Sequence, residues 1–184
     1  IDGVPVSAFN RRQLAQLVGL VPQKPYLFSG TIASNLRFGS EFATDDQLWE
    51  ALETAQAADF VAEKPDQLAE NVAQGGTNFS GGQRQRLCIA RALAAKPLVY
   101  VFDDSFSALD YRTDAKLREG LSKQLHDTTK IIVAQRISTI RHADKIIVLD
   151  RGETVGIGTH EELMKNCDVY REIATSQLSA AELA

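Results

Sequence analysis

Residues 78–86 read Asn-Phe-Ser-Gly-Gly-Gln-Arg-Gln-Arg, and this stretch decides the fold more than any other. Ser80 followed by Gln83 has the spacing of a capping box, which predicts a helix that begins at Gly81. The two glycines leave backbone N–H groups uncovered at the helix start. Because bare amides and the positive end of a helix dipole favour an anion, this N-terminus suits a phosphate.

A buried strand is predicted one helix length further along the chain. Residues 98–102 read Leu-Val-Tyr-Val-Phe, and Asp103 and Asp104 follow them. A near-continuous apolar run predicts a strand buried on both faces. Acidic residues at the carboxyl end of such a strand suit a magnesium ion that is bound beside phosphates.

The remaining pattern predicts a mostly parallel α/β sheet, because strands alternate with helices in the second half of the chain. We expect strands at residues 17–21, 130–134, 145–149 and 154–157, and helices at 31–37, 44–55, 57–63, 81–96, 112–125, 137–142 and from 159 onward. Thr44 and Thr159 have the same capping-box spacing as Ser80, and Arg151-Gly152 is expected to turn a hairpin between the last two strands. Residues 31–91 carry no strand signal and are predicted to be a helical insertion. Residues after Gln177 are expected to fray.

Composition fits a soluble globular class, with 44% hydrophobic and 24% charged residues in 184. The net charge of −4, without a basic stripe, argues against a nucleic-acid partner. Cys88 and Cys167 lie far apart and read as reduced thiols, and His126, His142 and His160 lack metal-ligand spacing. No apolar run approaches the ~18 residues of a membrane span.

The order of these segments resembles the signature and Walker B motifs of ATP-binding cassette (ABC) transporter ATPase domains, over residues 2–174. The resemblance implies an α/β P-loop NTPase (RecA-like) core. Within a partial nucleotide-binding domain at residues 1–184, it implies a helical signature subdomain at about 31–91 and core at about 92–174. It also implies Mg-ATP as the ligand.

The resemblance also implies roles for individual residues. Gln23, in the Val-Pro-Gln of residues 21–23, would approach the magnesium and sense the γ-phosphate, and Asp103 would hold magnesium through water. A neutral amide suits the first role because it both accepts and donates. The residues expected to bind nucleotide are Gln23, Ser80, Gly81, Gly82, Gln83 and Asp110, the last in a D-loop that touches the opposing subunit.

Two stretches resemble exporters in particular. Residues 26–36 read Tyr-Leu-Phe-Ser-Gly-Thr-Ile-Ala-Ser-Asn-Leu, as in exporter-type rather than importer ATPases. Residues 71–76 occupy the segment that exporters place near the membrane domain, although Gln74 departs from the usual glutamate-containing form. We therefore expect a transmembrane domain, fused upstream, and a location on the cytoplasmic face of the cell membrane.

Two departures from the family pattern predict weak hydrolysis. Asp104 stands where a catalytic glutamate is usual, and its shorter side chain withdraws the carboxylate by about 1 Å, which can cost on the order of a hundredfold. Gln135, in the Ala-Gln-Arg-Ile-Ser-Thr-Ile of residues 134–140, stands where the switch histidine is usual. Glutamine donates a hydrogen bond but cannot become cationic.

A third departure is the missing phosphate loop. No G-x-x-x-x-G-K-[ST] motif occurs, and the glycine spacing at residues 76–82 lacks its lysine. The usual adenine-stacking aromatic residue is missing as well. Residues 1–3, Ile-Asp-Gly, read as a strand end and turn, so we expect the chain to begin just after Walker A and to be inactive alone.

The asymmetry between an intact signature and an altered Walker B and switch resembles one half of a heterodimeric exporter. The signature, with Phe79 in place of the usual leucine, would complete the site of a second ABC ATPase subunit. Two alternatives stay open: a soluble ABC ATPase of chromosome maintenance, DNA repair or translation, and a non-catalytic interaction module. The residues before Ile1 would separate them.

Overall fold

The computed structural model describes residues 1–178, which divide into a first unit, residues 1–133, and a second unit from residue 134 onward. Each unit has a hydrophobic core of its own. The predicted division into a helical subdomain at about 31–91 and a core at about 92–174 stays a prediction. The predicted fraying after Gln177 falls largely on residues 179–184, which lie outside the described residues.

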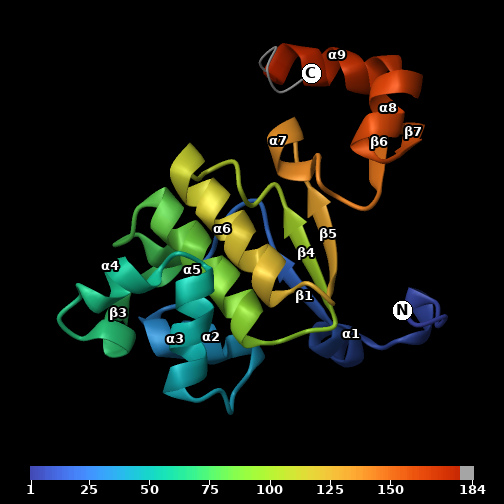
Figure 1. The fold of residues 1–184 in the computed structure, drawn as a ribbon. Helices are drawn as coiled ribbons and strands as arrows, with labels where there is room; N and C mark the ends of the chain where they lie inside the picture. The colour runs from blue at the N-terminus through green and yellow to red at the C-terminus, as the bar shows by residue number, and fades with distance from the viewer. Residues whose placement is uncertain (179–184) are drawn as a thin grey trace. The chain divides into compact units, whose positions relative to one another are not determined.

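The first unit contains a three-stranded parallel sheet (Figure 1). Its order is β1 (Val18–Val21), β4 (Val99–Asp103) and β5 (Thr129–Val133). Val21 lies opposite Phe102 on β4, and Asp103 lies opposite Val133 on β5. The predicted parallel α/β fold is confirmed.

One face of this sheet is buried and the other is not. Tyr100 and Phe102 of β4 are buried, with stacked rings 6.1 Å apart. On the opposite face, Leu20, Ile131 and Val133 are 58%, 51% and 53% exposed. On β4 itself, Val99 and Val101 of this face are half-buried. The prediction that β4 is buried on both faces therefore holds for the face of Tyr100 and Phe102 alone.

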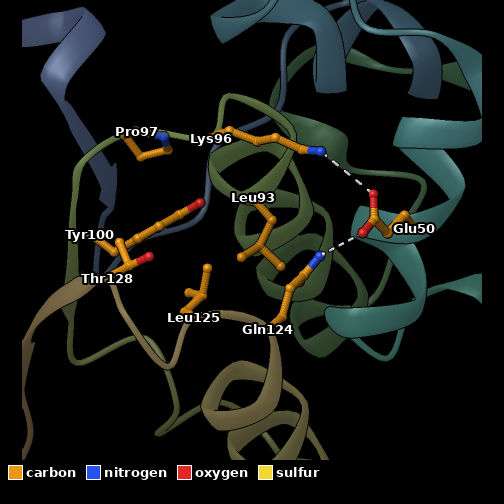
Figure 2. A pocket seen from close by; sticks show the side chains of 8 residues that line it. All are labelled: Glu50, Leu93, Lys96, Pro97, Tyr100, Gln124, Leu125 and Thr128. Carbon is orange, nitrogen blue, oxygen red and sulfur yellow. Dashed lines mark hydrogen bonds and ion pairs between the residues drawn. The ribbon is translucent and has the colours of Figure 1, made fainter.

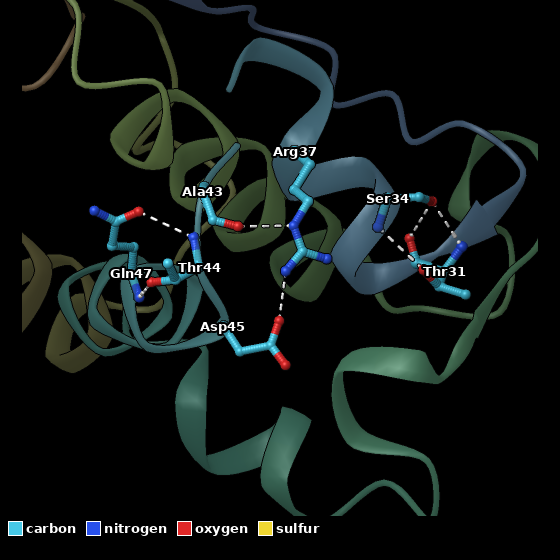
Figure 3. A network of polar contacts seen from close by, with 7 residues as sticks. All are labelled: Thr31, Ser34, Arg37, Ala43, Thr44, Asp45 and Gln47. Atoms are coloured by element: carbon cyan, nitrogen blue, oxygen red, sulfur yellow. Dashed lines mark hydrogen bonds and ion pairs between the residues drawn. The ribbon is translucent and has the colours of Figure 1, made fainter. Parts of the chain in front are cut away.

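Helices make up most of the region between β1 and β4. They are α2 (Ile32–Leu36), α3 (Asp45–Thr54), α4 (Ala58–Ala62) and α5 (Gly81–Ala94), with 3₁₀ turns at Arg37–Gly39, Gln67–Ala69 and Gln74–Gly76. Capping boxes start three of them, as the sequence predicts at Thr44 and Ser80. Figure 3 shows Arg37 joining α2 to α3: it donates to the Ala43 carbonyl at 2.9 Å and forms an ion pair with Asp45.

The helical region contains a short strand pair that the sequence pattern did not predict. β2 (Gly30–Thr31) pairs antiparallel with β3 (Asn71–Val72). The expectation of an insertion without strands is therefore wrong. The sequence did not show these strands because two residues are too few for a period-two pattern. The side chain of Asn78 supports β3, because it donates to the Asn71 carbonyl at 2.8 Å and accepts from the Ala73 amide at 3.1 Å.

Two more helices complete the first unit, with a 3₁₀ turn at Val6–Ala8. α6 (Tyr111–Gln124) matches the predicted helix at 112–125. The other, α1 (Arg11–Leu17), was not predicted, although Asn10 and Gln13 form a capping box at its start. Residues 1–4 form a turn in which the Val4 amide donates to the Ile1 carbonyl at 2.9 Å.

The second unit packs helices against a β-hairpin. β6 (Ile146–Asp150) and β7 (Glu153–Gly158) are antiparallel, as predicted. α7 (Ile137–Ile140), α8 (His160–Asn166) and α9 (Asp168–Gln177) match the expected helical segments. The core of this unit consists of Ile137, Ile146, Val148, Leu163, Cys167, Tyr170, Ala174 and Leu178.

Candidate functional site

The carboxyl ends of β1 and β4 bring three predicted residues to one edge of the sheet. Gln23 lies two residues beyond β1, while Asp103 ends β4 and Asp104 follows it. The Gln23 amide Nε2 donates to Asp104 Oδ2 at 3.3 Å, across 81 residues of sequence. Ligands of parallel sheets bind outside the carboxyl ends of the strands, so this edge is the expected place for a nucleotide.

The backbone at Asp104 is held on both sides. Its φ of 43° lies in the left-handed region, and its N–H donates to the Val133 carbonyl of β5 at 2.9 Å. Its carbonyl accepts from Ser107 Oγ at 2.9 Å. Buried Ser105 donates from Oγ to the Val21 carbonyl at 2.9 Å, which ties the end of β4 to β1. No sequence pattern pointed to Ser105.

The chemistry of this edge fits magnesium bound together with a nucleotide. Asp103 is half-buried and Gln23 is exposed, and they offer a carboxylate and an amide oxygen. Within residues 1–178, no three His, Cys, Asp or Glu side chains gather as a metal site. Magnesium is commonly held by one or two carboxylates, with phosphates and water as its other ligands, so these residues suit Mg-ATP.

The start of α5 is a second predicted site. Ser80 Oγ accepts from the Gln83 amide at 3.3 Å, and Gln83 Oε1 accepts from the Ser80 amide at 3.0 Å. Gln83 is thus engaged in the capping box, whereas the Ser80 hydroxyl keeps its proton for donation. The first amides of a helix have no acceptor within the helix, and this holds for those of Gly81 and Gly82 in α5.

The two glycines are not needed by the fold of this chain. A Cβ at Gly81 would meet nothing within 4 Å, and one at Gly82 would lie 3.7 Å from the Ala108 carbonyl oxygen, an ordinary contact. Neither residue has a positive φ. Because glycine destabilises a helix by up to about 1 kcal/mol relative to alanine, the absence of side chains here favours close approach by a group outside the chain.

The residues around these glycines anchor the helix. Arg84 Nη1 donates to the Phe79 carbonyl at 2.7 Å, and Arg86 Nη1 donates to the Gln56 carbonyl at 2.5 Å. The Arg86 guanidinium lies 4.9 Å from the centre of the Phe60 ring, and burial lowers the pKa of Arg86. Phe79 itself is buried, so its replacement of leucine is a packing feature of the helical region.

Asp110 caps the next helix. Its Oδ1 accepts from the Thr113 amide at 3.0 Å and its Oδ2 accepts from Thr113 Oγ1 at 2.7 Å, and these bonds lower the pKa of Asp110. The Asp110 side chain is exposed. The predicted contact of this residue with an opposing subunit stays a prediction.

Gln135 lies in the second unit, between β5 and α7, and its side chain is exposed. The Gln177 side chain contacts the backbone on both sides of Arg136. Gln177 Nε2 donates to the Gln135 carbonyl at 2.9 Å, and Gln177 Oε1 accepts from the Ile137 amide at 2.9 Å. No sequence pattern pointed to Gln177.

A pocket of about 320 Å³ lies at the amino end of β4, the opposite end of the strand from Asp103 (Figure 2). Glu50 lies at one side of it, 3.6 Å from Lys96 Nζ and 3.2 Å from Gln124 Nε2. Burial raises the pKa of Tyr100, which also lines the pocket, to about 12. Its position separates this pocket from the strand edge that carries Gln23 and Asp104.

Comparisons with known proteins agree with the resemblance of the motifs. The family profile described as ABC transporter matches residues 1–107. An uncharacterized ABC transporter ATP-binding protein of Mycobacterium tuberculosis is 51% identical over 184 residues, covering 98% of this chain and 31% of that protein. ABC transporter B family member 2 of Dictyostelium discoideum is 40% identical over 177 residues, covering 96% of this chain and 13% of that protein.

A solved structure agrees as well. A bacterial Atm1-family ABC exporter with ATP bound matches with a TM-score of 0.91 and 34% identity, over 96% of this chain and 31% of that chain. The chain thus spans about a third of the length of the mycobacterial relative and of the exporter. Within residues 1–178, no helix is both long and apolar enough to cross a membrane.

Proposed function

This chain belongs to the ABC transporter family, and we propose that it is the ATP-binding component of an exporter, on the cytoplasmic face of the cell membrane. The observation that carries the proposal is the contact between Gln23 and Asp104 at 3.3 Å, beside Asp103, at the carboxyl edge of a parallel sheet. The similarity to an exporter with ATP bound supports the direction of transport. A transmembrane domain is the partner to which ATP binding and hydrolysis would be coupled.

Each residue at the strand edge has a proposed task. Magnesium, when bound with ATP, neutralises charge on the phosphates. Asp103 would hold the ion through water. The Gln23 amide would accept from a metal-bound water and donate to an oxygen of the γ-phosphate. Asp104 orients the attacking water. Asp110 is proposed to contact the opposing subunit at the subunit interface.

The same edge is proposed to hydrolyse ATP slowly. Asp104 is one methylene shorter than glutamate, and its carboxylate already accepts a hydrogen bond from Gln23. A displacement of about 1 Å can cost on the order of a hundredfold in rate. Gln135 can donate a hydrogen bond to a γ-phosphate but cannot carry a positive charge. It is therefore proposed to stabilise bound ATP more than it stabilises the negative charge that develops in the transition state.

The start of α5 is proposed to serve a different nucleotide. Ser80 donates its hydroxyl, and Gly81 and Gly82 offer amides, to ATP bound by a second, non-identical ABC ATPase subunit. Two observations support this: the side chains of Ser80 and Gln83 each accept from the other residue's backbone amide, and neither glycine is required by packing within the chain. The second subunit is proposed to be non-identical because this intact helix start contrasts with the departures at Asp104 and Gln135 in the same chain, which would make the chain one half of a heterodimer.

An exposed aromatic group is the proposed contact with the transmembrane domain. Phe38 is 70% exposed and stacks on Phe28 with ring centres 4.5 Å apart, and Tyr26 meets Phe28 edge-on at 5.4 Å. Arg91 lies over the Phe28 ring at 5.6 Å. Aromatic residues and arginine are enriched at the centres of protein interfaces, and these rings are already ordered by one another.

Purification of the assembled transporter tests the proposal. The polypeptide that carries this chain is tagged, extracted from membranes with detergent, and its ATP-binding subunits are counted by mass spectrometry. We expect a second, different ATP-binding subunit in equal amount, and ATP hydrolysis that EDTA abolishes. Recovery of copies of this chain alone would contradict the heterodimer, and an assembly that neither binds nor hydrolyses ATP would contradict the whole proposal.

A further inference from the structure

The last residue of α9 holds the backbone next to Gln135. Gln177 Nε2 donates to the Gln135 carbonyl and Gln177 Oε1 accepts from the Ile137 amide, both at 2.9 Å. The Ile137 amide is the first of α7, and such an amide has no acceptor within its own helix. One side chain therefore satisfies two backbone groups on either side of Arg136.

The position of Gln177 is fixed by packing in the second unit. Tyr170, Ala174 and Leu178, on or just after α9, are buried in the same core as Ile137. His160 Nδ1 lies 2.8 Å from the Tyr170 hydroxyl, which joins α8 to α9. Figure 1 shows these helices in orange and red at the carboxyl end of the chain. A buried core thus sets where the amide of Gln177 lies.

We propose that Gln177 is a positioning residue for Gln135, so that α9 sets the direction in which the switch side chain points. The proposal rests on the role given to Gln135 under the proposed function. A planar amide is needed because it donates and accepts at once. Glutamate offers an acceptor but no donor, and methionine has a similar length but forms neither bond.

Loss of this positioning should weaken the binding of a nucleotide only if that nucleotide carries a γ-phosphate. Gln135 is proposed to donate to that group, which ADP lacks, so loosening the Gln135 backbone weakens ATP binding and leaves ADP binding unchanged. A single neutral hydrogen bond contributes a factor of about two to ten in an equilibrium constant. We therefore expect Gln177→Met to weaken ATP binding to this subunit about three- to tenfold relative to ADP.

The test uses the assembled transporter with photo-crosslinkable azido-ATP and azido-ADP, because the label reports which subunit holds the nucleotide. Gln177→Met and Gln177→Glu should both lower the ratio of ATP to ADP affinity at this subunit. Ser176→Ala is the matched control, since Ser176 Oγ donates to the Ile173 carbonyl within α9 at 2.7 Å. On a Gln135→Ala background, Gln177→Met should cause no further loss. Hydrogen exchange of the peptide that contains the Ile137 amide should be faster in Gln177→Met than in Ser176→Ala.

The outcomes separate this proposal from the one on which it rests. If Gln135→Ala lowers the affinity ratio and Gln177→Met does not, the positioning role is wrong and the role of Gln135 stands. If Gln177→Met weakens ATP and ADP equally, Gln177 is merely structural. If Gln135→Ala leaves the ratio unchanged, the γ-phosphate role of Gln135 fails, and the positioning role fails with it.

Discussion

The first unit presents two candidate nucleotide-binding regions that are built in opposite ways. At the start of α5, the side chains of Ser80 and Gln83 each accept from the other residue's backbone amide, and the glycines between them have few neighbours. At the strand edge, Gln23 reaches across to Asp104, whose backbone is bonded to β5. The helix start is thus open, whereas the strand edge is tied together by its own polar groups.

This difference indicates what each region lacks. We propose that the helix start binds a group from outside the chain, because nothing in the fold explains two glycines at positions where alanine would fit. The strand edge has the acidic and amide groups in place, but its candidate water-orienting carboxylate is short and already hydrogen-bonded. We therefore expect substitutions at the helix start to cost more activity than substitutions at Asp104.

The largest expected effect is that of Gly82→Asp. A carboxylate at the start of α5 would repel the phosphates of the partner's ATP, and we expect ATP hydrolysis by the heterodimer to fall on the order of a hundredfold. The fold should survive, because a Cβ at Gly82 makes only an ordinary contact, at 3.7 Å from the Ala108 oxygen, and an acid suits a helix N-terminus. Steady-state ATP hydrolysis by the purified transporter measures the effect.

Asp104→Asn is the matched comparison for Gly82→Asp. It removes the charge at the strand edge while keeping the size of the side chain, and it should change total hydrolysis little. A greater loss with Asp104→Asn than with Gly82→Asp would reverse the comparison and assign the competent site to this chain's own strand edge.

The next effect is a gain of activity from repair of the slow site. Asp104→Glu and Gln135→His are introduced together on the Gly82→Asp background, in which the partner's site is expected to be silent. Hydrolysis should then rise at least about tenfold, because positioned acid–base groups typically contribute about 10²–10⁴-fold. The two changes should be non-additive, because both act on one transition state. The measurement is single-turnover hydrolysis, with each single repair as a control. Unchanged turnover in the double repair would show that another group limits this site.

Much of the fold could be predicted because its signals are local. Capping boxes at Thr44, Ser80 and Thr159 fixed three helix starts, and the apolar runs located β1, β4, β5 and β6. The same local logic failed where a signal was short or came from elsewhere in the fold. The ladder of β2 and β3 is two residues long, and the exposed face of the sheet depends on which helices pack against it.

The candidate site could be predicted only as a set of residues. Motif spacing pointed to Gln23 and Asp104, but their hydrogen bond joins residues 81 apart and follows from the pairing of β1 with β4. Ser105 and Gln177 carry no motif signal, because no spacing or residue pattern in the sequence distinguishes either of them from its neighbours. Their importance comes from the backbone groups that they contact: the Val21 carbonyl for Ser105, and the Gln135 and Ile137 backbone for Gln177.

The smallest effect separates folding from function at Gly81. A Cβ there meets nothing within 4 Å, so Gly81→Ala should raise the free energy of unfolding by about 0.5 kcal/mol through helix propensity and a less flexible unfolded chain. The same methyl group would stand where the partner's phosphates approach and should lower ATP hydrolysis by the heterodimer. Urea unfolding of this chain measures the first change and steady-state hydrolysis the second. Greater stability together with lower activity would show that Gly81 is kept for a ligand. Full activity in Gly81→Ala would mean that the open space at the helix start is not a binding surface, and the contrast with the strand edge would then rest on Gly82 alone.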